Sequence, residues 1–255
     1  MRRLIPILLL LVLAAPAFAG WKVVRIHSNG EGGVDTTVTL IGSQKLRMEA
    51  SGEITLVDVQ KGEIVALLPE QKRYWKGNAR TFHRELKTLM DGMMDAMLQQ
   101  LPEDRRENMR KMIEAQREQH RKSMQRLNAR ATGATETIAG VKAKVYKLTL
   151  DGKVVARLWV GHHPLEKDMD FGKLSAMMRM EDSGSLTDAP AYQKLASEGL
   201  ILKEERTADQ SYEAVVKIEQ TDLPDDWFAI PEGYTPATLQ ELMQGMMNAP
   251  MNGGE

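Results

Sequence analysis

Residues 45–76 read KLRMEASGEITLVDVQKGEIVALLPEQKRYWK, and this stretch decides the fold class. Its first segment, Lys45–Glu49, alternates apolar and charged side chains, which is typical of a strand with one buried face. Turns that contain glycine separate it from two further strand patterns, Ile54–Val59 and Glu63–Leu68. Because the last of these is apolar on both faces, we expect both sides of the sheet to be covered there.

The same alternation extends from this stretch toward the N-terminus and for one more segment beyond it. Trp21–His27 and Val34–Ile41 alternate with period two, and the turn-rich segment Asn29–Gly33 separates them. Arg73–Lys76 adds a further short segment after the turn at Pro69–Lys72. The N-terminal half therefore predicts an antiparallel meander of five or six strands.

After this meander the apolar period changes from two to three or four, as on one face of an amphipathic helix. The apolar positions are Phe82, Leu86, Leu89, Met90, Met93, Met97, Leu98 and Leu101. Pro102 interrupts the pattern and favours the start of a second helix. This second segment, Glu103–Arg130, carries nine basic and five acidic residues beside a thin apolar stripe. We therefore predict a helical hairpin over residues 79–130, inserted between two β halves, whose second helix lies on the surface and projects from the body.

Strand patterns resume at Thr135. Val141–Leu150 and Lys153–Val160 flank Asp151-Gly152, which is a strong β-hairpin signal. The apolar phase slips inside the first of these strands, which predicts a β-bulge near Val145. Later patterns predict short helices over 171–180 and 191–197, strands over 200–206 and 212–219, and a short helix over 239–246. A long antiparallel sheet with helices inserted on one side is an α+β architecture.

Residues 1–19 have the form of a secretory signal peptide. Two arginines precede the apolar run Leu4–Leu13, and Ala17-Phe18-Ala19 matches the pattern that signal peptidase cleaves. The run is shorter than the roughly 20 residues that span a bilayer. We therefore expect cleavage before Gly20 and a soluble exported, periplasmic product.

The expected product is one domain over residues 20–247, followed by a disordered tail at 248–255. The chain has no cysteine, which excludes both a disulfide and the lipid attachment of a bacterial lipoprotein. From residue 20 onward the chain has 32 basic and 35 acidic residues, a net charge of about −3. Such a balance gives no reason to expect a nucleic-acid partner.

No catalytic arrangement stands out in the sequence. The densest set of potential ligands is His162–Asp168, but adjacent histidines in a strand point to opposite faces, so a loop that closes a strand is expected there. There is no Gly-x-Ser-x-Gly motif, no cysteine nucleophile and no glycine-rich phosphate loop after a strand. We therefore expect no enzyme, no metal site and no cofactor.

Four segments resemble an exported bacterial family that is known only as a domain of unknown function. They are Lys45–Glu49, Pro69–Tyr74, Gly140–Trp159 with its Asp-Gly hairpin, and Trp227–Tyr234. The resemblance covers most of the chain after the leader. Members of the family often have a cysteine near the position of Ala143, and this chain departs from them there.

That family is similar in fold to the periplasmic lipoprotein carriers of the LolA and LolB type. The resemblance implies a strongly curved antiparallel sheet that forms an incomplete barrel, with helices over its concave side and an apolar cavity between them. The cavity candidates are Leu46, Met48, Leu56, Leu68, Trp75, Leu86, Leu89, Met90, Met93 and Met97. Which alternate residues of each strand face the cavity depends on a register that the sequence leaves open.

The leading functional hypothesis is a carrier-like binding protein for a lipid, an acyl chain or a lipoprotein. The alternative is a protein-interaction or envelope-stress-sensing module on the same fold. A third hypothesis is copper handling, because thioethers bind Cu(I) and methionines cluster at 90–97, 177–180 and 243–247. For the basic segment 103–130 we expect a solvated surface, or peripheral contact with an anionic membrane.

Overall fold

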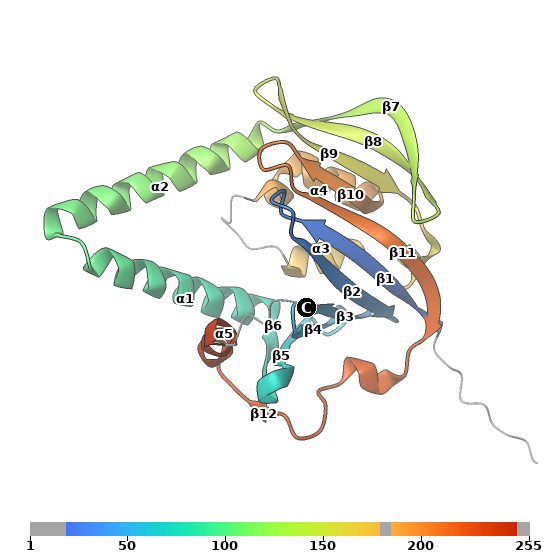
Figure 1. Ribbon diagram of the computed structural model, residues 1–255, viewed down its shortest axis with the longest axis horizontal. Helices are drawn as coiled ribbons and strands as arrows, with labels where there is room; N and C mark the ends of the chain where they lie inside the picture. Colours follow the sequence, from blue (N-terminus) through green and yellow to red (C-terminus); the bar gives the residue numbers. More distant parts are fainter. Residues whose placement is uncertain (1–18, 179–184, 249–255) are drawn as a thin grey trace, which may run out of the picture.

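The computed structural model describes residues 19–178 and 185–248, so the expected signal peptide and C-terminal tail fall almost entirely outside the described residues. The body is built on one sheet of twelve strands, in the order β12-β6-β5-β4-β3-β2-β1-β11-β10-β9-β8-β7. Every neighbouring pair is antiparallel except β12 with β6. The sheet is curved but open, because its end strands, β12 and β7, do not pair with each other (Figure 1).

The strands are β1 (Ala19–Ser28), β2 (Val34–Gly42), β3 (Lys45–Ala50), β4 (Glu53–Asp58), β5 (Glu63–Leu68), β6 (Arg73–Asn78), β7 (Asn128–Ile138), β8 (Val141–Leu150), β9 (Lys153–Gly161), β10 (Leu200–Arg206), β11 (Tyr212–Asp222) and β12 (Thr235–Pro236). The helices are α1 (Ala79–Gln99), α2 (Glu103–Gln125), α3 (Phe171–Met178), α4 (Pro190–Glu198) and α5 (Leu239–Asn248). The 3-10 helices are η1 (Pro69–Gln71), η2 (Pro164–Lys167), η3 (Leu186–Asp188) and η4 (Asp225–Phe228). The α+β prediction and the six-strand N-terminal meander are confirmed.

Both faces of the sheet are covered along the N-terminal meander. Leu46, Val57 and Ile64 pair across β3, β4 and β5 and point to one face, here called the inner face. Residues of α1, α3 and α5 pack against this inner face. On the outer face, Val65 and Leu67 of β5 pack with residues of the segment that follows β11. The expectation that β5 is covered on both sides is confirmed.

The Asp-Gly hairpin forms as predicted between β8 and β9. Asp151 and Gly152 have φ angles of 49° and 80°, and glycine takes such positive values without steric cost. The β7–β8 pairing is irregular at Val145, near the predicted bulge, but the extra residues, 132–134, belong to β7. The pairing of β8 with β9 shifts register at Leu148/Thr149. The apolar phase slips for another reason, since Val145 is buried on one face of β8 and Leu148 on the other.

The second β half begins earlier than predicted. Helix α2 ends at Gln125, and β7 begins at Asn128, which pairs with Thr149, rather than at Thr135. Most side chains of β7 are exposed because it is the last strand of the sheet. An exposed edge strand needs no apolar alternation, which explains why periodicity missed its start.

The helical hairpin extends well beyond the sheet (Figure 1). Helix α1 packs on the core through its N-terminal half, and α2 returns to the body at Met124 and Leu127. Between its ends, most described side chains of α2 are exposed.

Residues 105–121 are therefore expected to exchange their amide hydrogens faster than Ile64–Leu67, because few buried contacts oppose local opening of α2. Hydrogen exchange followed by mass spectrometry measures this difference directly. Equal protection of the two segments would contradict the projecting hairpin.

Candidate functional site

Six of the ten candidate cavity residues belong to the inner-face core. They are Leu46, Leu68 and Trp75, which are buried, and Met48, Leu86 and Leu89, which are partly buried. The same core receives Met177 from α3 and Leu239 and Leu242 from α5. Sheet and helices therefore pack directly on each other around these residues.

Leu56 does not share this face, so its placement in the cavity is wrong. In the β3–β4 pair, Leu46 lies opposite Val57, whereas Leu56 lies opposite Arg47. Neighbouring residues of a strand point to opposite faces, so Leu56 points outward. There it packs with Val65 of the outer-face cluster. A shift of one residue in register decides this placement, and the sequence does not encode that register locally.

The three methionine candidates of α1 are also not in a buried cavity. Met90, Met93 and Met97 are 51%, 52% and 54% exposed, on the part of α1 that extends past the sheet. Met93 follows Leu89 by four residues, so it continues the line of α1 that contacts the core. The helical periodicity was predicted correctly, but the contact of α1 with the inner-face core ends at Leu89, before Met93.

Met112 of α2 is also half-exposed, at 56%. Asp95 of α1 and Arg110 of α2 bridge the two helices with a 2.9 Å ion pair. Met93 is two residues from Asp95, and Met112 is two residues from Arg110. A separation of two residues corresponds to roughly 200° around a helix axis. Both methionines therefore lie on the side away from the bridge.

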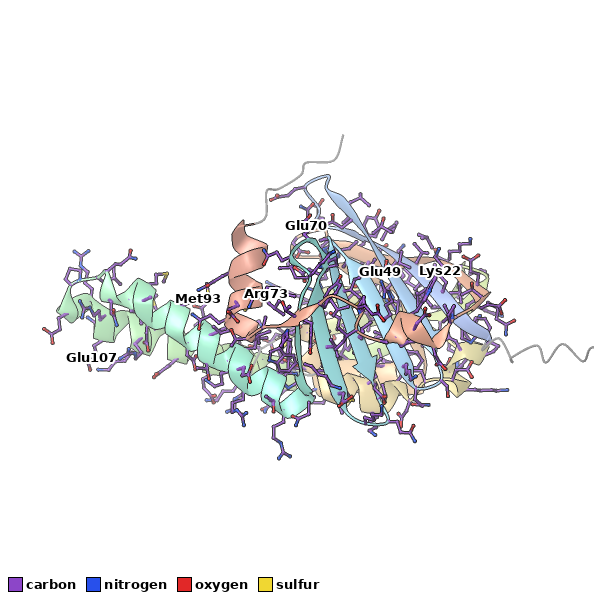
Figure 2. All side chains as sticks on the ribbon, turned by 90° about the horizontal axis from the view of Figure 1, so that it is seen from below. Lys22, Glu49, Glu70, Arg73, Met93 and Glu107 are labelled. Carbon is purple, nitrogen blue, oxygen red and sulfur yellow. The ribbon has the colours of Figure 1, made fainter. Side chains whose placement is uncertain are left out.

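We call Met90, Met93, Met97 and Met112 the methionine surface. Figure 2 shows Met93 on the side of the hairpin from which α5 rises, with Glu107 on the opposite side. Methionine is flexible and polarizable, so a surface of this kind adapts to apolar partners of varied shape.

The body end of α1 is fixed by contacts with β6. The indole N–H of Trp75 donates to Glu85 at 2.8 Å, and its ring meets that of Phe82 edge-on at 5.3 Å. Asn78 caps the helix by accepting a 2.8 Å hydrogen bond from the backbone N–H of Thr81. These contacts set the direction in which α1 leaves the sheet.

Helix α5 is fixed beside α1 by a capping box and an ion pair. The backbone N–H of Thr238 donates to Glu241 at 2.8 Å, and Arg73 of β6 contacts the same carboxylate at 3.0 Å. The Thr238 hydrogen bond and Arg73 lower the pKa of Glu241 to about 2. The carboxylate therefore stays charged at neutral pH and holds α5 to the edge of the sheet.

Two cavities have no lining residue from α1, α3 or α5. One of about 280 Å³ is on the outer face, between β3–β6 and the segment Phe228–Ile230. The other, of about 480 Å³, lies beside the β10–β11 turn and is lined by Arg157, Glu205 and Tyr212 among others. Both have charged residues in their lining, whereas the methionine surface is apolar.

The His162–Asp168 segment is held in place by structural hydrogen bonds. His163 caps η2 by accepting from the backbone N–H of Leu165 at 3.2 Å, and Trp21 stacks edge-on against its ring at 4.7 Å. The Trp21 indole N–H in turn donates to Asp168 at 2.7 Å. Burial lowers the pKa of His163, although the charge of Glu166 opposes that shift. These contacts support a loop that closes β9.

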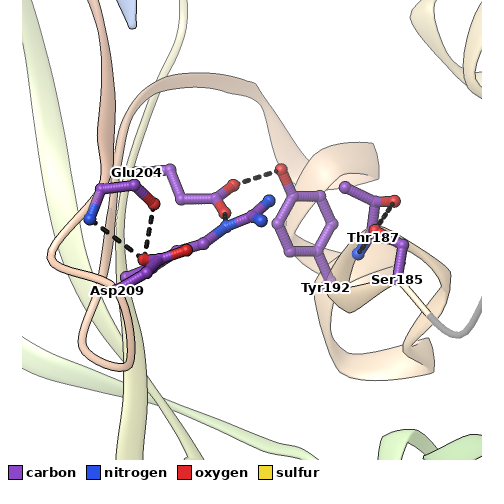
Figure 3. A network of polar contacts seen from close by, with 7 residues as sticks. Ser185, Thr187, Tyr192, Glu204 and Asp209 are labelled. Atoms are coloured by element: carbon purple, nitrogen blue, oxygen red, sulfur yellow. Dashed lines mark hydrogen bonds and ion pairs between the residues drawn. The ribbon is translucent and has the colours of Figure 1, made fainter. Parts of the chain in front are cut away.

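A second polar network joins α4 to β10 (Figure 3). The hydroxyl of buried Tyr192 donates to Glu204 at 2.9 Å, and Arg206 contacts the other carboxylate oxygen at 2.7 Å. Burial, together with the charge of Glu204, raises the pKa of Tyr192. The hydroxyl therefore stays protonated as a donor, and the network is structural.

The structure divides the methionine groups of the copper hypothesis. Met177 is buried in the inner-face core, whereas Met90, Met93 and Met97 of α1 are half-exposed. The side chains of Met180, Met246 and Met247 lie outside the described residues. Within residues 19–178 and 185–248, no group of three or more His, Asp or Glu side chains is placed to hold a metal ion. None of the helices described there combines the length and hydropathy of a membrane span.

Fold and surface together define an open, curved-sheet α+β domain with a projecting helical hairpin that exposes methionines. The family model described as "Domain of unknown function (DUF4412)" matches residues 18–234, so the chain belongs to that family. The predicted membership of a domain-of-unknown-function family is thus confirmed. Among proteins with curated descriptions, none matches the chain.

Similar solved structures include PNGF-II, at 10% identity and a TM-score of 0.42, with 90% of this chain and 33% of that chain covered. MucB matches at 10% identity and a TM-score of 0.32, over 82% of this chain and 56% of MucB. A LolA superfamily protein from Nitrosomonas europaea matches at 10% identity and a TM-score of 0.25, over 84% and 91% of the two chains. The chain thus spans about a third of PNGF-II and little more than half of MucB, and no functional argument rests on likenesses this distant.

Proposed function

We propose that the protein is an exported binding protein that takes an apolar ligand, such as a lipid, an acyl chain or a lipoprotein segment, on the methionine surface. The single observation that carries the proposal is the placement of four half-exposed methionines on one side of the hairpin. Most large apolar side chains of a stable domain are buried, and a contiguous exposed group is typical of a binding surface.

The energetics favour reversible binding. An acyl chain gains about 0.8 kcal/mol for each methylene that it buries, so a dozen buried methylenes supply on the order of 10 kcal/mol. This figure is an upper bound, because an open surface covers the chain on one side only. Association offsets at least about 4 kcal/mol of this gain, because the ligand loses translational and rotational freedom when it binds. Weak, exchangeable binding follows, which suits a carrier.

A protein-interaction module is the second candidate, and the projecting hairpin favours it. A helix of a partner can lie along α1 and bury the same methionines, as amphipathic helices do in apolar grooves. Since both candidates use one surface, the nature of the bound molecule distinguishes them.

Met93→Asp is expected to weaken the binding of a fluorescent fatty acid at least tenfold, because it places a charge in the middle of the methionine surface. Competition of unlabelled lipids against the probe gives the affinity. Val216→Asp is the matched control, since Val216 is 48% exposed on β11, away from the hairpin. Both positions are exposed, so both variants are expected to stay folded.

The control should bind the probe as the parent does. If the folded parent takes up no lipid or acylated peptide at micromolar concentration, the carrier proposal is wrong. Equal weakening by both substitutions would also contradict the assignment of the site to the hairpin.

A further inference from the structure

The carboxylates near the methionine surface are on other sides of the two helices. On α1, Asp91 and Asp95 are each two residues from Met93, which places them roughly 200° away. On α2, Glu114 is two residues from Met112 and therefore also points away from it. Glu107 lies on the side opposite Met93 in Figure 2. An apolar ligand on the methionine surface thus meets none of these negative charges.

Arg105, by contrast, is a charged residue on the same side of the hairpin as the methionine surface. It precedes Met112 by seven residues, or two helical turns, so the two side chains lie on one line of α2. Its side chain is exposed, and it forms no ion pair with the acidic residues that the structure describes. The neighbouring Arg106 is instead held at the end of α1, where it donates to the carbonyl oxygens of Gln99 and Leu101 at 2.9 and 2.7 Å.

Arg105 also stands at a defined end of the methionine surface. It is in the first turn of α2, close to the turn that joins the two helices. From Met97, near that turn, to Met90, toward the body, α1 rises by about 10 Å at roughly 1.5 Å per residue. The surface is therefore an apolar strip with Arg105 at its outer end, a cation that has no ion pair among the described side chains.

We propose that the ligand of the methionine surface is an anionic amphiphile, whose acyl chain lies on the methionines and whose carboxylate or phosphate group is bound by Arg105. The planar guanidinium group can donate two parallel hydrogen bonds to either kind of head group. The proposal rests on the proposed function for the apolar contact and adds the chemistry that selects the ligand. It also orients the bound molecule, with the head at the tip of the hairpin and the chain toward the body.

The test compares amphiphiles that share one alkyl chain and differ in the head group. Dodecanoate, dodecyl phosphate, dodecanol and dodecyltrimethylammonium compete for the fluorescent fatty acid on the parent protein. Dodecanoate or dodecyl phosphate is expected to bind more tightly than the neutral and cationic compounds. The difference between these two anions identifies the head group as a carboxylate or a phosphate.

Arg105→Gln is expected to weaken binding of the preferred anion about fivefold, the range of an exposed ion pair, and to leave dodecanol unchanged. Arg117→Gln is the matched control, because it removes the same charge five residues after Met112, roughly 140° away around α2. Retained affinity in this control supports a specific contact at Arg105.

Equal weakening by Arg105→Gln and Arg117→Gln would show a general effect of charge and overturn the proposal. Dodecanol that binds as tightly as the anions would overturn it as well, while leaving the proposed function intact. If none of the four amphiphiles binds the parent, the proposed function fails together with this inference.

Discussion

Trp75→Ala is expected to lower the free energy of unfolding by about 3–5 kcal/mol, the range for truncating a buried aromatic side chain to alanine. The Trp75 side chain is 5% exposed in the inner-face core. Its loss removes the ring contact with Phe82 and leaves Glu85 without the indole donor. The substitution therefore loosens both the core and the attachment of α1. Urea unfolding followed by far-UV circular dichroism measures the change in stability.

Two variants separate burial from the individual contacts of this residue. Trp227→Ala makes the same substitution at a tryptophan that is 45% exposed, so a change within about 0.5 kcal/mol is expected. Trp75→Phe keeps a ring in the core and removes the hydrogen bond to Glu85, so an intermediate loss is expected. A loss for Trp75→Ala no larger than that for Trp227→Ala would contradict the role of Trp75 as the anchor of α1.

Tyr192→Phe is expected to cost about 1–3 kcal/mol, although it removes a single oxygen atom, because it leaves a buried acceptor without its donor. Glu204 is 8% exposed, and the Tyr192 hydroxyl is one of its two side-chain partners. Thermal and urea unfolding of the parent and the variant give this difference.

The double variant Tyr192→Phe/Glu204→Leu is the informative comparison. Replacing a buried polar pair by apolar residues of similar volume is often close to neutral, so stability should return to within about 1 kcal/mol of the parent. Arg206 then loses its carboxylate partner, but its side chain is 45% exposed and can be solvated. A double variant less stable than Tyr192→Phe would show that the contact of Glu204 with Arg206 matters more than the hydroxyl.

Local patterns predicted most of the elements. The turns after β3, β4 and β8 each contain a glycine at positive φ, and the alternation between these turns defined the strands. The change of period at Phe82 and the interruption at Pro102 located both helices of the hairpin. Prediction failed where an element lacks an apolar face, as at the start of β7.

The candidate site was predicted less well, for two physical reasons. Leu56 was placed on the wrong face because strand register is fixed by pairing with β3 and β5, not by the local alternation of β4. Met90, Met93 and Met97 were placed in a cavity because a helix that packs on a core and a helix that extends past it have the same periodicity. Met112 lies on the same side of the hairpin as these methionines only because of how α1 and α2 pair at Asp95 and Arg110, which the sequence does not predict.

The sequence by itself determined the order of the main strands and helices along the chain, the family and the polar character of α2. Each of these depends on residue patterns within short segments of the chain. The tertiary structure alone decided which apolar side chains are buried, because burial depends on where the opposing layer ends. The sheet, α3 and α5 cover α1 only as far as Leu89. Beyond that point Leu98 is buried, but Met90, Met93 and Met97 of the same amphipathic stripe are half-exposed, so this part of the predicted cavity lining is an exposed surface.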